Sequence, residues 1–207
     1  TPMVEYLVRL LGQEQVAILS RGYRRKTKGF VLADDSATAM TLGDEPYQYH
    51  RKFPQATVAV CESRQEGIER LLENPHFKYI ILDDAFQHRK VQAGTNLLLT
   101  SYDKLYTQEK KKKKIIQQLK PLPSQKVYFT TIAYSDRVYS HEDSQALKDF
   151  IATPFTLVTG IANPTPLVNF LEKQGASFEH LAYSDHHHFS NRELEFLRQK
   201  ERILTTE

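Results

Sequence analysis

The chain has 207 residues and a mass of 24.0 kDa, with 40% hydrophobic and 26% charged residues, so it can build the core of one large domain or two small ones. Its single cysteine, Cys61, excludes an internal disulfide framework and a cysteine-rich zinc site. The net charge of +3 is too small to predict nucleic-acid binding, and the longest apolar runs are too short to span a bilayer.

Helical and strand patterns alternate along the first part of the chain. Apolar residues at helical spacing predict a first helix that ends at Gly12. Strands are then predicted at 16–19, 57–60, 79–82 and 96–100, and helices at 44–50, with Asp44 as N-cap and Pro46 near its first position, and at 66–72. Unbroken apolar strands that alternate with helices predict an α/β fold, with a parallel sheet covered by helices on both faces.

A parallel sheet rarely opens with its covering helix, because each such helix follows a strand. We therefore expect a strand and a loop upstream of Thr1 that this chain does not contain. The alternative is a sheet that begins with a helix.

A second, smaller α/β unit is predicted in the last third of the chain. A basic helix at 110–119, stopped by Pro121, comes before it, and the elements that follow are strands at 127–132, 156–159 and 202–204 and helices at 144–151, 167–173 and 192–200. We place the boundary near residue 130, which gives domains at 1–130 and 131–207.

The sharpest local motif is a buried-type strand, 79–82, that runs into Asp83 and Asp84. This is the Walker B arrangement, which places carboxylates at the carboxyl edge of a parallel sheet, where they can hold Mg²⁺ beside nucleotide phosphates. The alternative is that the two acids only form the turn after the strand. Gln87 and His88 add an amide and an imidazole to the same loop.

Two further motifs lie at helix or strand ends. The segment 20–26 follows a strand and includes Arg21, Tyr23 and Arg24; arginine forks suit phosphate, although a solvated basic loop explains the pattern equally well. Asp44 and Glu45 stand at a helix start, where a plain N-cap is the alternative reading.

The fourth motif is Asp185 followed by three histidines, 186–188. An Asp-His pair can orient an imidazole for acid–base chemistry. Three adjacent histidines cannot all face one metal on a regular element, because neighbouring side chains point apart. The alternative to a functional pair is an ordinary surface loop.

In their order along the chain, these four motifs resemble those of tetraacyldisaccharide 4′-kinase, the lipid A 4′-kinase of Gram-negative bacteria. The resemblance extends over almost the whole chain, and the sequence of residues 85–89 is similar to that found in the Bacteroidetes branch of the family. It implies a P-loop kinase with two α/β units and a hinge, which transfers the γ-phosphate of ATP to the 4′-hydroxyl of an acylated glucosamine disaccharide 1-phosphate. It also implies ATP and Mg²⁺ as cofactors.

The resemblance implies roles for individual residues. Asp44 matches the catalytic base and His186 its partner, while Asp83 and Asp84 match residues that serve Mg²⁺ and the attacking geometry. Thr1-Pro2 looks like the tail of the Walker A loop, so Thr1 would be a hydroxyl ligand of Mg²⁺. The cleft is expected to include these further residues: Arg21, Tyr23, Arg24, Glu45, Gln87, His88 and Asp185.

The chain departs from the family pattern at three places. The glycines and lysine of the Walker A loop would lie upstream of Thr1, and an Arg-Glu stretch expected after Tyr106 is missing. The end at 205–207 also looks cut short. These departures keep two rivals open: another P-loop small-molecule kinase, and a non-catalytic nucleotide-binding module.

The resemblance also implies a partner and a location. The substrate's acyl chains lie in the membrane, so we expect peripheral contact with anionic lipid at the cytoplasmic face of the bacterial inner membrane. Basic residues at 21–28 or 110–114 could supply that contact, although a basic run is more often a solvated surface.

Overall fold

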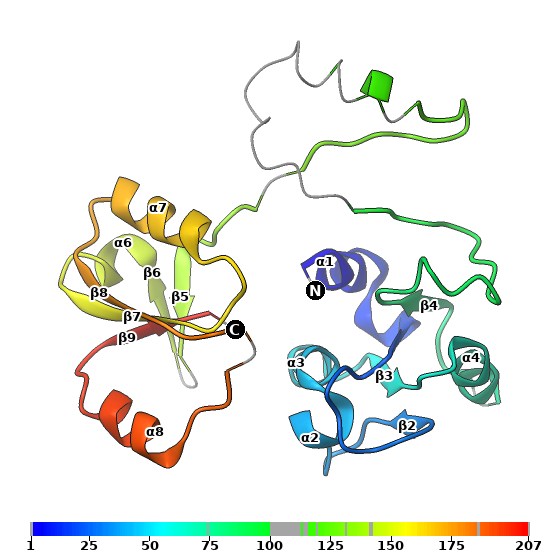
Figure 1. The fold of residues 1–207 in the computed structure, drawn as a ribbon, viewed down its shortest axis with the longest axis horizontal. Coiled ribbons are helices and arrows are strands. Elements are labelled where there is room, and N and C mark those ends of the chain that lie inside the picture. The colour runs from blue at the N-terminus through cyan, green and yellow to red at the C-terminus, as the bar shows by residue number, and fades with distance from the viewer. Residues whose placement is uncertain are drawn as a thin grey trace. The chain divides into compact units, whose positions relative to one another are not determined.

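The computed structural model describes residues 2–73, 75–99, 113, 116–118, 120–130, 132–140, 143–185 and 187–206. Contacts divide the chain into two compact units, Thr1–Leu99 and Thr100–Glu207 (Figure 1). This division comes earlier than the predicted boundary near residue 130. Only part of the stretch between the two positions is described, so the end of the first domain within it stays a prediction.

The first unit is built on a four-stranded sheet with the order β2-β3-β1-β4. β1 pairs in parallel with β3 and with β4, whereas the short β2 pairs antiparallel with β3. Ser20 lies opposite Val60, and Leu19 opposite Leu82, so the three parallel strands end at one edge. The strands are β1 (Val16–Ser20), β2 (Val31–Leu32), β3 (Thr57–Val60) and β4 (Tyr79–Leu82).

Helices cover both faces of this sheet, as the unbroken apolar strands predict. α1 and α3 pack on one face, where Val8 and Tyr49 contact the core around Ile18. α4 packs on the other face, where Leu71 joins the cluster around Leu19. The helices are α1 (Pro2–Leu11), the 3-10 helix η1 (Gln13–Gln15), α2 (Ala39–Leu42), α3 (Asp44–Lys52) and α4 (Arg64–Leu72).

The second unit has a three-stranded parallel sheet with the order β8-β7-β9. Figure 1 shows α7 and α8 on opposite sides of this sheet. Its core gathers Leu157 of β7, Leu171 of α7 and Phe150 of α6. The elements are the hairpin β5 (Arg137–Tyr139) and β6 (Ser144–Ala146), α6 (Leu147–Phe150), β7 (Phe155–Thr159), α7 (Thr165–Lys173), β8 (Phe178–Ala182), α8 (Asn191–Arg198) and β9 (Ile203–Thr205).

Two predicted strands are wrong. Residues 96–99 form no strand, and Leu98 is 68% exposed. Residues 127–130 and 132 likewise form no strand, and Tyr128 is 75% exposed. An apolar or alternating run becomes a strand only where a neighbouring strand pairs with it, and neither stretch has such a partner among the described residues.

Three other predictions need correction in detail. Residues 144–151, predicted as one helix, divide into β6 and α6. Among the described strands β4 pairs with β1 alone, so it lies at the edge of the sheet, and its residues are exposed or half-buried. Asp44 is the first residue of α3 rather than its cap, since Gly43 holds the cap position, and Pro46 lies two residues further on.

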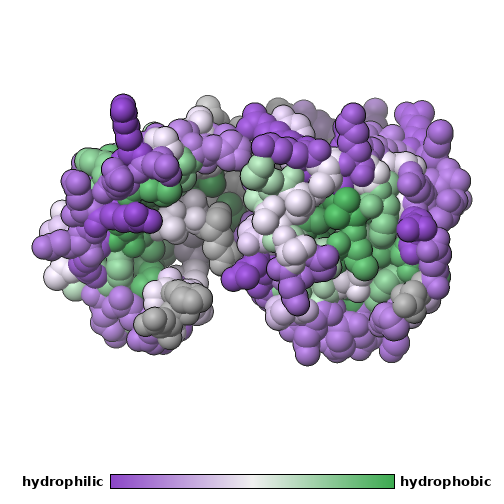
Figure 2. Space-filling model, turned by 90° about the horizontal axis from the view of Figure 1, so that it is seen from below, coloured by the Kyte–Doolittle hydropathy of each residue, from purple (hydrophilic) through white to green (hydrophobic). Residues whose placement is uncertain are grey.

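The predicted basic helix at 110–119 falls mostly outside the described residues. Lys113 and residues 116–118 are helical. No helix in the described part of the chain is long and apolar enough to cross a membrane. Figure 2 shows hydrophilic residues around apolar areas on the viewed face of each unit.

Gly67 provides a test of the packing between α4 and the sheet. Replacing a glycine inside a helix with alanine normally raises the free energy of unfolding by about 1 kcal/mol. Here an added Cβ would lie 2.7 Å from Leu19 Cδ2 and 3.1 Å from Cys61 Cβ, and both residues are fully buried. We therefore expect Gly67→Ala to lower the free energy of unfolding by about 1–2 kcal/mol, because overpacking outweighs helix propensity.

Urea denaturation followed by circular dichroism measures this change. Glu69→Ala, an exposed substitution on the same helix, is the control and should stay within about 0.5 kcal/mol of the parent. A Gly67→Ala protein as stable as the parent, or more stable, would contradict the packing described here.

Candidate functional site

Three strands deliver their following residues to one edge of the first sheet. The strand ladder continues one residue beyond β3 and β4, because Cys61 donates its amide to Ser20 O at 3.0 Å and Asp83 donates its amide to Leu19 O at 3.1 Å. Asp83 is thus fixed beside the point where the chain leaves β1 toward Arg21. Ligands of parallel α/β sheets bind at this carboxyl edge.

Asp83 is held by groups from three elements. Tyr49 of α3 donates its hydroxyl to Asp83 Oδ2 at 3.0 Å. Arg64, only 2% exposed at the start of α4, donates to the main-chain oxygens of Asp83 and Cys61 at 3.0 and 2.8 Å. These contacts fix both the carboxylate and the backbone that carries it.

The environment of Asp83 disfavours its charge. Burial raises the pKa of Asp83 above its ordinary value, and the negative charge of Glu45 raises it further. The hydrogen bond from Tyr49 opposes both effects without cancelling them. Asp83 is therefore a carboxylate that gains from an added positive charge, which is the condition a divalent cation would meet.

The loop after β4 turns sharply at Asp84. Its φ of 45° lies in the left-handed region, which aspartate tolerates better than most residues. Gln87 donates its side-chain amide to Asp84 O at 3.2 Å, and His88 donates its main-chain amide to Ala85 O at 2.9 Å. The turn leaves Asp84 and Gln87 exposed and buries His88 Nε2, which has no hydrogen-bond partner among the described residues.

Two glycines bring the loop after β1 close to the start of α3. Gly43 has a φ of 91°, and a Cβ there would lie 2.8 Å from Tyr23 O. Gly22 has a φ of 73°, and a Cβ there would lie 2.7 Å from Leu42 O. Asp44 therefore begins α3 directly beside the loop that follows β1, at the positive end of the helix dipole.

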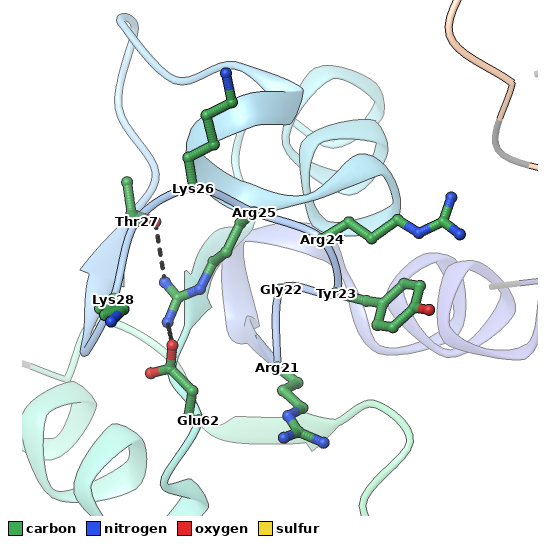
Figure 3. A pocket seen from close by; sticks show the side chains of 9 residues that line it. All are labelled: Arg21, Gly22, Tyr23, Arg24, Arg25, Lys26, Thr27, Lys28 and Glu62. Atoms are coloured by element: carbon green, nitrogen blue, oxygen red, sulfur yellow. Dashed lines mark hydrogen bonds and ion pairs between the residues drawn. The ribbon is translucent and has the colours of Figure 1, made fainter.

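The basic loop forms a pocket of about 350 Å³ together with Glu62. Figure 3 shows Arg25 turned toward Glu62, whereas Tyr23 and Arg24 project together from the loop. The Arg24 guanidinium lies 5.4 Å from the centre of the Tyr23 ring, and its backbone is left-handed, with a φ of 60°. Arg21, Tyr23 and Arg24 are exposed, so they are available to an anionic ligand.

The fourth motif lies in the second unit, in the loop after β8. His186 lies outside the described residues, and Asp185 is exposed. His187 Nε2 lies 3.0 Å from Glu193 Oε1, and its ring stacks on Tyr183 at 4.7 Å. The neighbour of His186 is thus anchored to α8, at the carboxyl end of β8.

The structure brings most of the predicted site residues to one edge of the first unit. The residues that lie there are Arg21, Tyr23, Arg24, Asp44, Glu45, Asp83, Asp84, Gln87 and His88. Thr1 lies outside the described residues, as His186 does. Asp185 belongs to the second unit, and its relation to this edge stays a prediction.

Sequence reasoning missed three residues that build the edge. Tyr49 and Arg64 hold Asp83, and Glu62 pairs with Arg25 at 2.8 Å. Only Arg64 had a usable signal, because it directly follows a serine that caps a helix after a strand. The other two contacts join positions 34 and 37 residues apart in the sequence, which no local pattern reveals.

A magnesium site fits the chemistry of this edge. Asp83 and Asp84 supply carboxylate oxygens, the ligands that Mg²⁺ prefers, and Asp83 is destabilised by the neighbouring charge of Glu45. Among the described residues no group of three or more His, Cys, Asp or Glu side chains forms a ready-made metal cluster. That finding is compatible with Mg²⁺, which usually takes one or two carboxylates and completes its shell with water and phosphate.

Comparisons with known proteins give one consistent result. The family profile described as Tetraacyldisaccharide-1-P 4'-kinase matches residues 1–110 and 103–207. The tetraacyldisaccharide 4'-kinase of Flavobacterium johnsoniae is 39% identical over 244 residues, which cover 100% of this chain and 71% of the relative. That of Bacteroides thetaiotaomicron is 36% identical over 245 residues, covering 97% of this chain and 64% of the relative.

A solved structure shares the fold. The crystal structure of the apo form of LpxK from Aquifex aeolicus in complex with ATP superposes with a TM-score of 0.67 and 24% sequence identity. The match covers 99% of this chain and 71% of that chain. At this identity the likeness establishes the α/β architecture.

The raised pKa of Asp83 predicts how stability depends on pH. The folded state binds the proton of Asp83 more tightly than the unfolded chain does, where the carboxyl group has its ordinary pKa of 3.8. The stability contributed by neutral Asp83 is therefore fully present below pH 3.8 and is lost as the pH rises through the folded-state pKa. Asp83→Asn keeps the shape and stays neutral, so it should melt above the parent at pH 7.5, by on the order of 2–4 °C.

Thermal melts between pH 4.5 and 8 measure this difference, which should shrink toward the acid end. Asp35→Asn is the control, since Asp35 is exposed. A variant that melts below the parent at pH 7.5, or a difference that does not change with pH, would contradict the electrostatic strain at Asp83.

Proposed function

Because the chain belongs to the tetraacyldisaccharide 4′-kinase family, we propose that it transfers the γ-phosphate of ATP to the 4′-hydroxyl of a tetraacylated glucosamine disaccharide 1-phosphate. This is a step of lipid A biosynthesis. The observation that carries the proposal is the convergence of three motifs on one sheet edge: the loop after β1, the start of α3 and the acids after β4.

ATP with Mg²⁺ supplies the transferred phosphoryl group and neutralises charge on it. Asp83 and Asp84 would hold the metal, together with the Thr1 hydroxyl. The bond from Tyr49 and the support from Arg64 keep Asp83 in a single position. A preorganised carboxylate needs no reorganisation when the phosphoryl group transfers.

Asp44 accepts the proton of the sugar hydroxyl in this proposal. A sugar hydroxyl is a weak nucleophile, so a positioned base contributes to the rate. Asp44 stands in the first turn of α3, one residue before Glu45, whose charge acts on Asp83. His186 is the proposed partner that tunes or relays this proton, with Asp185 beside it.

The remaining site residues would bind the anionic parts of the two substrates. Arg21 and Arg24 are exposed and suited to phosphate, and Tyr23 lies under the Arg24 guanidinium. Glu45, Gln87 and His88 are second-rank candidates for the disaccharide. Within the described part of the chain the buried Nε2 of His88 has no hydrogen-bond partner, so this ring can gain a contact when a ligand binds.

The acylated substrate requires the protein to reach the membrane. We place it at the cytoplasmic face of the bacterial inner membrane, in peripheral contact with anionic lipid. Arg21, Arg24, Lys26 and Lys28 are exposed, whereas Arg25 is buried, so four of the five basic residues of this loop can face lipid. Each contributes about 1 kcal/mol near an anionic surface.

The assigned base gives a direct test in the full-length protein. Asp44→Asn removes the proton acceptor, so we expect kcat to fall about 10²- to 10⁴-fold while the affinity for ATP changes little. The assay follows transfer of labelled γ-phosphate to the disaccharide 1-phosphate, with His186→Ala measured beside it. Asp149→Asn, an exposed substitution in the second unit, is the control.

The outcomes separate the proposal from its rivals. Near-normal turnover of Asp44→Asn would remove Asp44 from the mechanism. Failure of the parent protein to phosphorylate the disaccharide, with ATP still bound, would point to another acceptor or to a non-catalytic nucleotide-binding module.

Membrane contact has its own test. Flotation with vesicles containing anionic lipid should recover the protein at low salt, and vesicles of zwitterionic lipid should recover much less. Replacing Lys26 and Lys28 with glutamine should weaken the affinity for anionic vesicles about 30-fold, because two charges that contribute about 1 kcal/mol each are lost. Equal recovery on both vesicle types would contradict an electrostatic contribution from this loop.

A further inference from the structure

Arg25 differs from every other basic residue of the loop that follows β1. Its side chain is 2% exposed, whereas those of Arg21, Arg24 and Lys26 belong to exposed residues. A buried guanidinium is costly unless it is paired and hydrogen-bonded. Arg25 is therefore part of the internal structure of the loop.

Glu62 provides the pairing, from the loop after β3. Arg25 Nη2 lies 2.8 Å from Glu62 Oε1 and also donates to Gly29 O at 2.6 Å. Glu62 Oε2 accepts the main-chain amide of Gly29 at 3.0 Å. Arg25 Nη1 donates to Thr27 Oγ1 at 3.4 Å. One carboxylate and one guanidinium thus close residues 25–29 into a fixed loop (Figure 3).

The fixed loop is joined to the segment that leads into α3. Lys26 donates its amide to Met40 O at 2.8 Å, and Thr27 donates its hydroxyl to Thr41 O at 2.5 Å. Arg25 also lies directly against Gly22, where an added Cβ would be 2.4 Å from Arg25 Cδ. The Arg25 side chain therefore supports the backbone of residues 22–23.

That backbone is in turn the surface against which Gly43 packs. The position of a Cβ on Gly43 would be 2.8 Å from Tyr23 O and 3.1 Å from Gly22 C. Gly43 caps α3, and Asp44 is its first residue. A continuous set of contacts runs from the Arg25–Glu62 pair through Gly22 and Gly43 to Asp44.

We propose that the Arg25–Glu62 ion pair is a positioning clamp for Asp44. The inference rests on the proposed function, in which Asp44 accepts the proton of the acceptor hydroxyl. Two glycines with positive φ allow the close approach of the loops, but they do not hold the loops in place. The clamp supplies the rigidity, and a misplacement of the base by about 1 Å can cost about 100-fold in rate.

The clamp remains charged at neutral pH. Partial burial raises the pKa of Glu62, but hydrogen bonds from its own amide, from Arg25 and from Gly29 lower that pKa below its ordinary value overall. Neutralising this carboxylate by mutation is therefore the direct way to weaken the clamp.

Glu62→Gln in the full-length protein tests the proposal, because it keeps the side-chain length and one oxygen but removes the charge. We expect kcat for phosphate transfer to the disaccharide to fall about 10- to 100-fold, with an unchanged KM for ATP. Glu66→Gln, an exposed substitution on α4, should leave kcat unchanged. All variants are assayed at a temperature at which circular dichroism shows them folded.

The same substitution in an Asp44→Asn background separates positioning from general damage. If the clamp acts through Asp44, Glu62→Gln should not lower the residual rate of Asp44→Asn any further. An equal loss in both backgrounds would overturn the proposal, and so would a kcat of Glu62→Gln equal to that of the parent.

Limited trypsin digestion gives a readout that does not depend on activity. The clamped segment carries cleavage sites at Arg25, Lys26 and Lys28, so Glu62→Gln should be cut there faster than the parent or Glu66→Gln. An unchanged cleavage rate would also overturn the clamp. If Asp44→Asn retains full activity while Glu62→Gln is cut faster, the assignment of Asp44 fails and the loop closure stands.

Discussion

The crowding of carboxylates at one sheet edge is the constraint on which the first unit depends. Asp83 is half-buried beside the charge of Glu45, with Asp44 one residue before that glutamate and Asp84 one residue after Asp83. Like charges this close disfavour the compact state, and the chain offsets them with a tyrosine hydroxyl, a buried arginine and the dipole of α3. Folded proteins tolerate such a cluster where function requires it.

The contacts that hold this edge come from parts of the chain far apart in sequence. Arg64 joins the ends of β3 and β4 through two main-chain oxygens, and Glu62, two residues earlier, closes the loop after β1. The segment between β3 and α4 is therefore the structural centre of the site, although it contributes none of the proposed reacting groups. The contacts of this short segment both hold the strand ends together and fix the position of Asp83.

Much of this architecture follows from local sequence patterns. The strands at 16–19, 57–60 and 79–82 are confirmed because their apolar runs find parallel partners, and the family resemblance read from four ordered motifs is confirmed by the relatives. The runs at 96–99 and 127–132 carry similar patterns without a partner, so periodicity alone misplaced them. The helix predicted at 144–151 was wrong for another reason: residues 144–146 pair with 137–139 in a hairpin and therefore form a strand.

The acidic residues of the candidate site could be predicted from the sequence, but the residues that hold them in place could be predicted only in part. Their positions directly after strands predicted Asp83, Asp84 and the basic loop. The sequence could not show that Arg25 is buried while Arg24 is exposed, because both are arginines of the same loop.

The central claim is that this edge holds a metal-bound triphosphate. A crystal structure of the full-length protein with Mg²⁺ and a non-hydrolysable ATP analogue tests it most directly. The account predicts the metal at about 2.1 Å from a carboxylate oxygen of Asp83 or Asp84, or joined to one through a single water; a nucleotide bound away from this edge would contradict it.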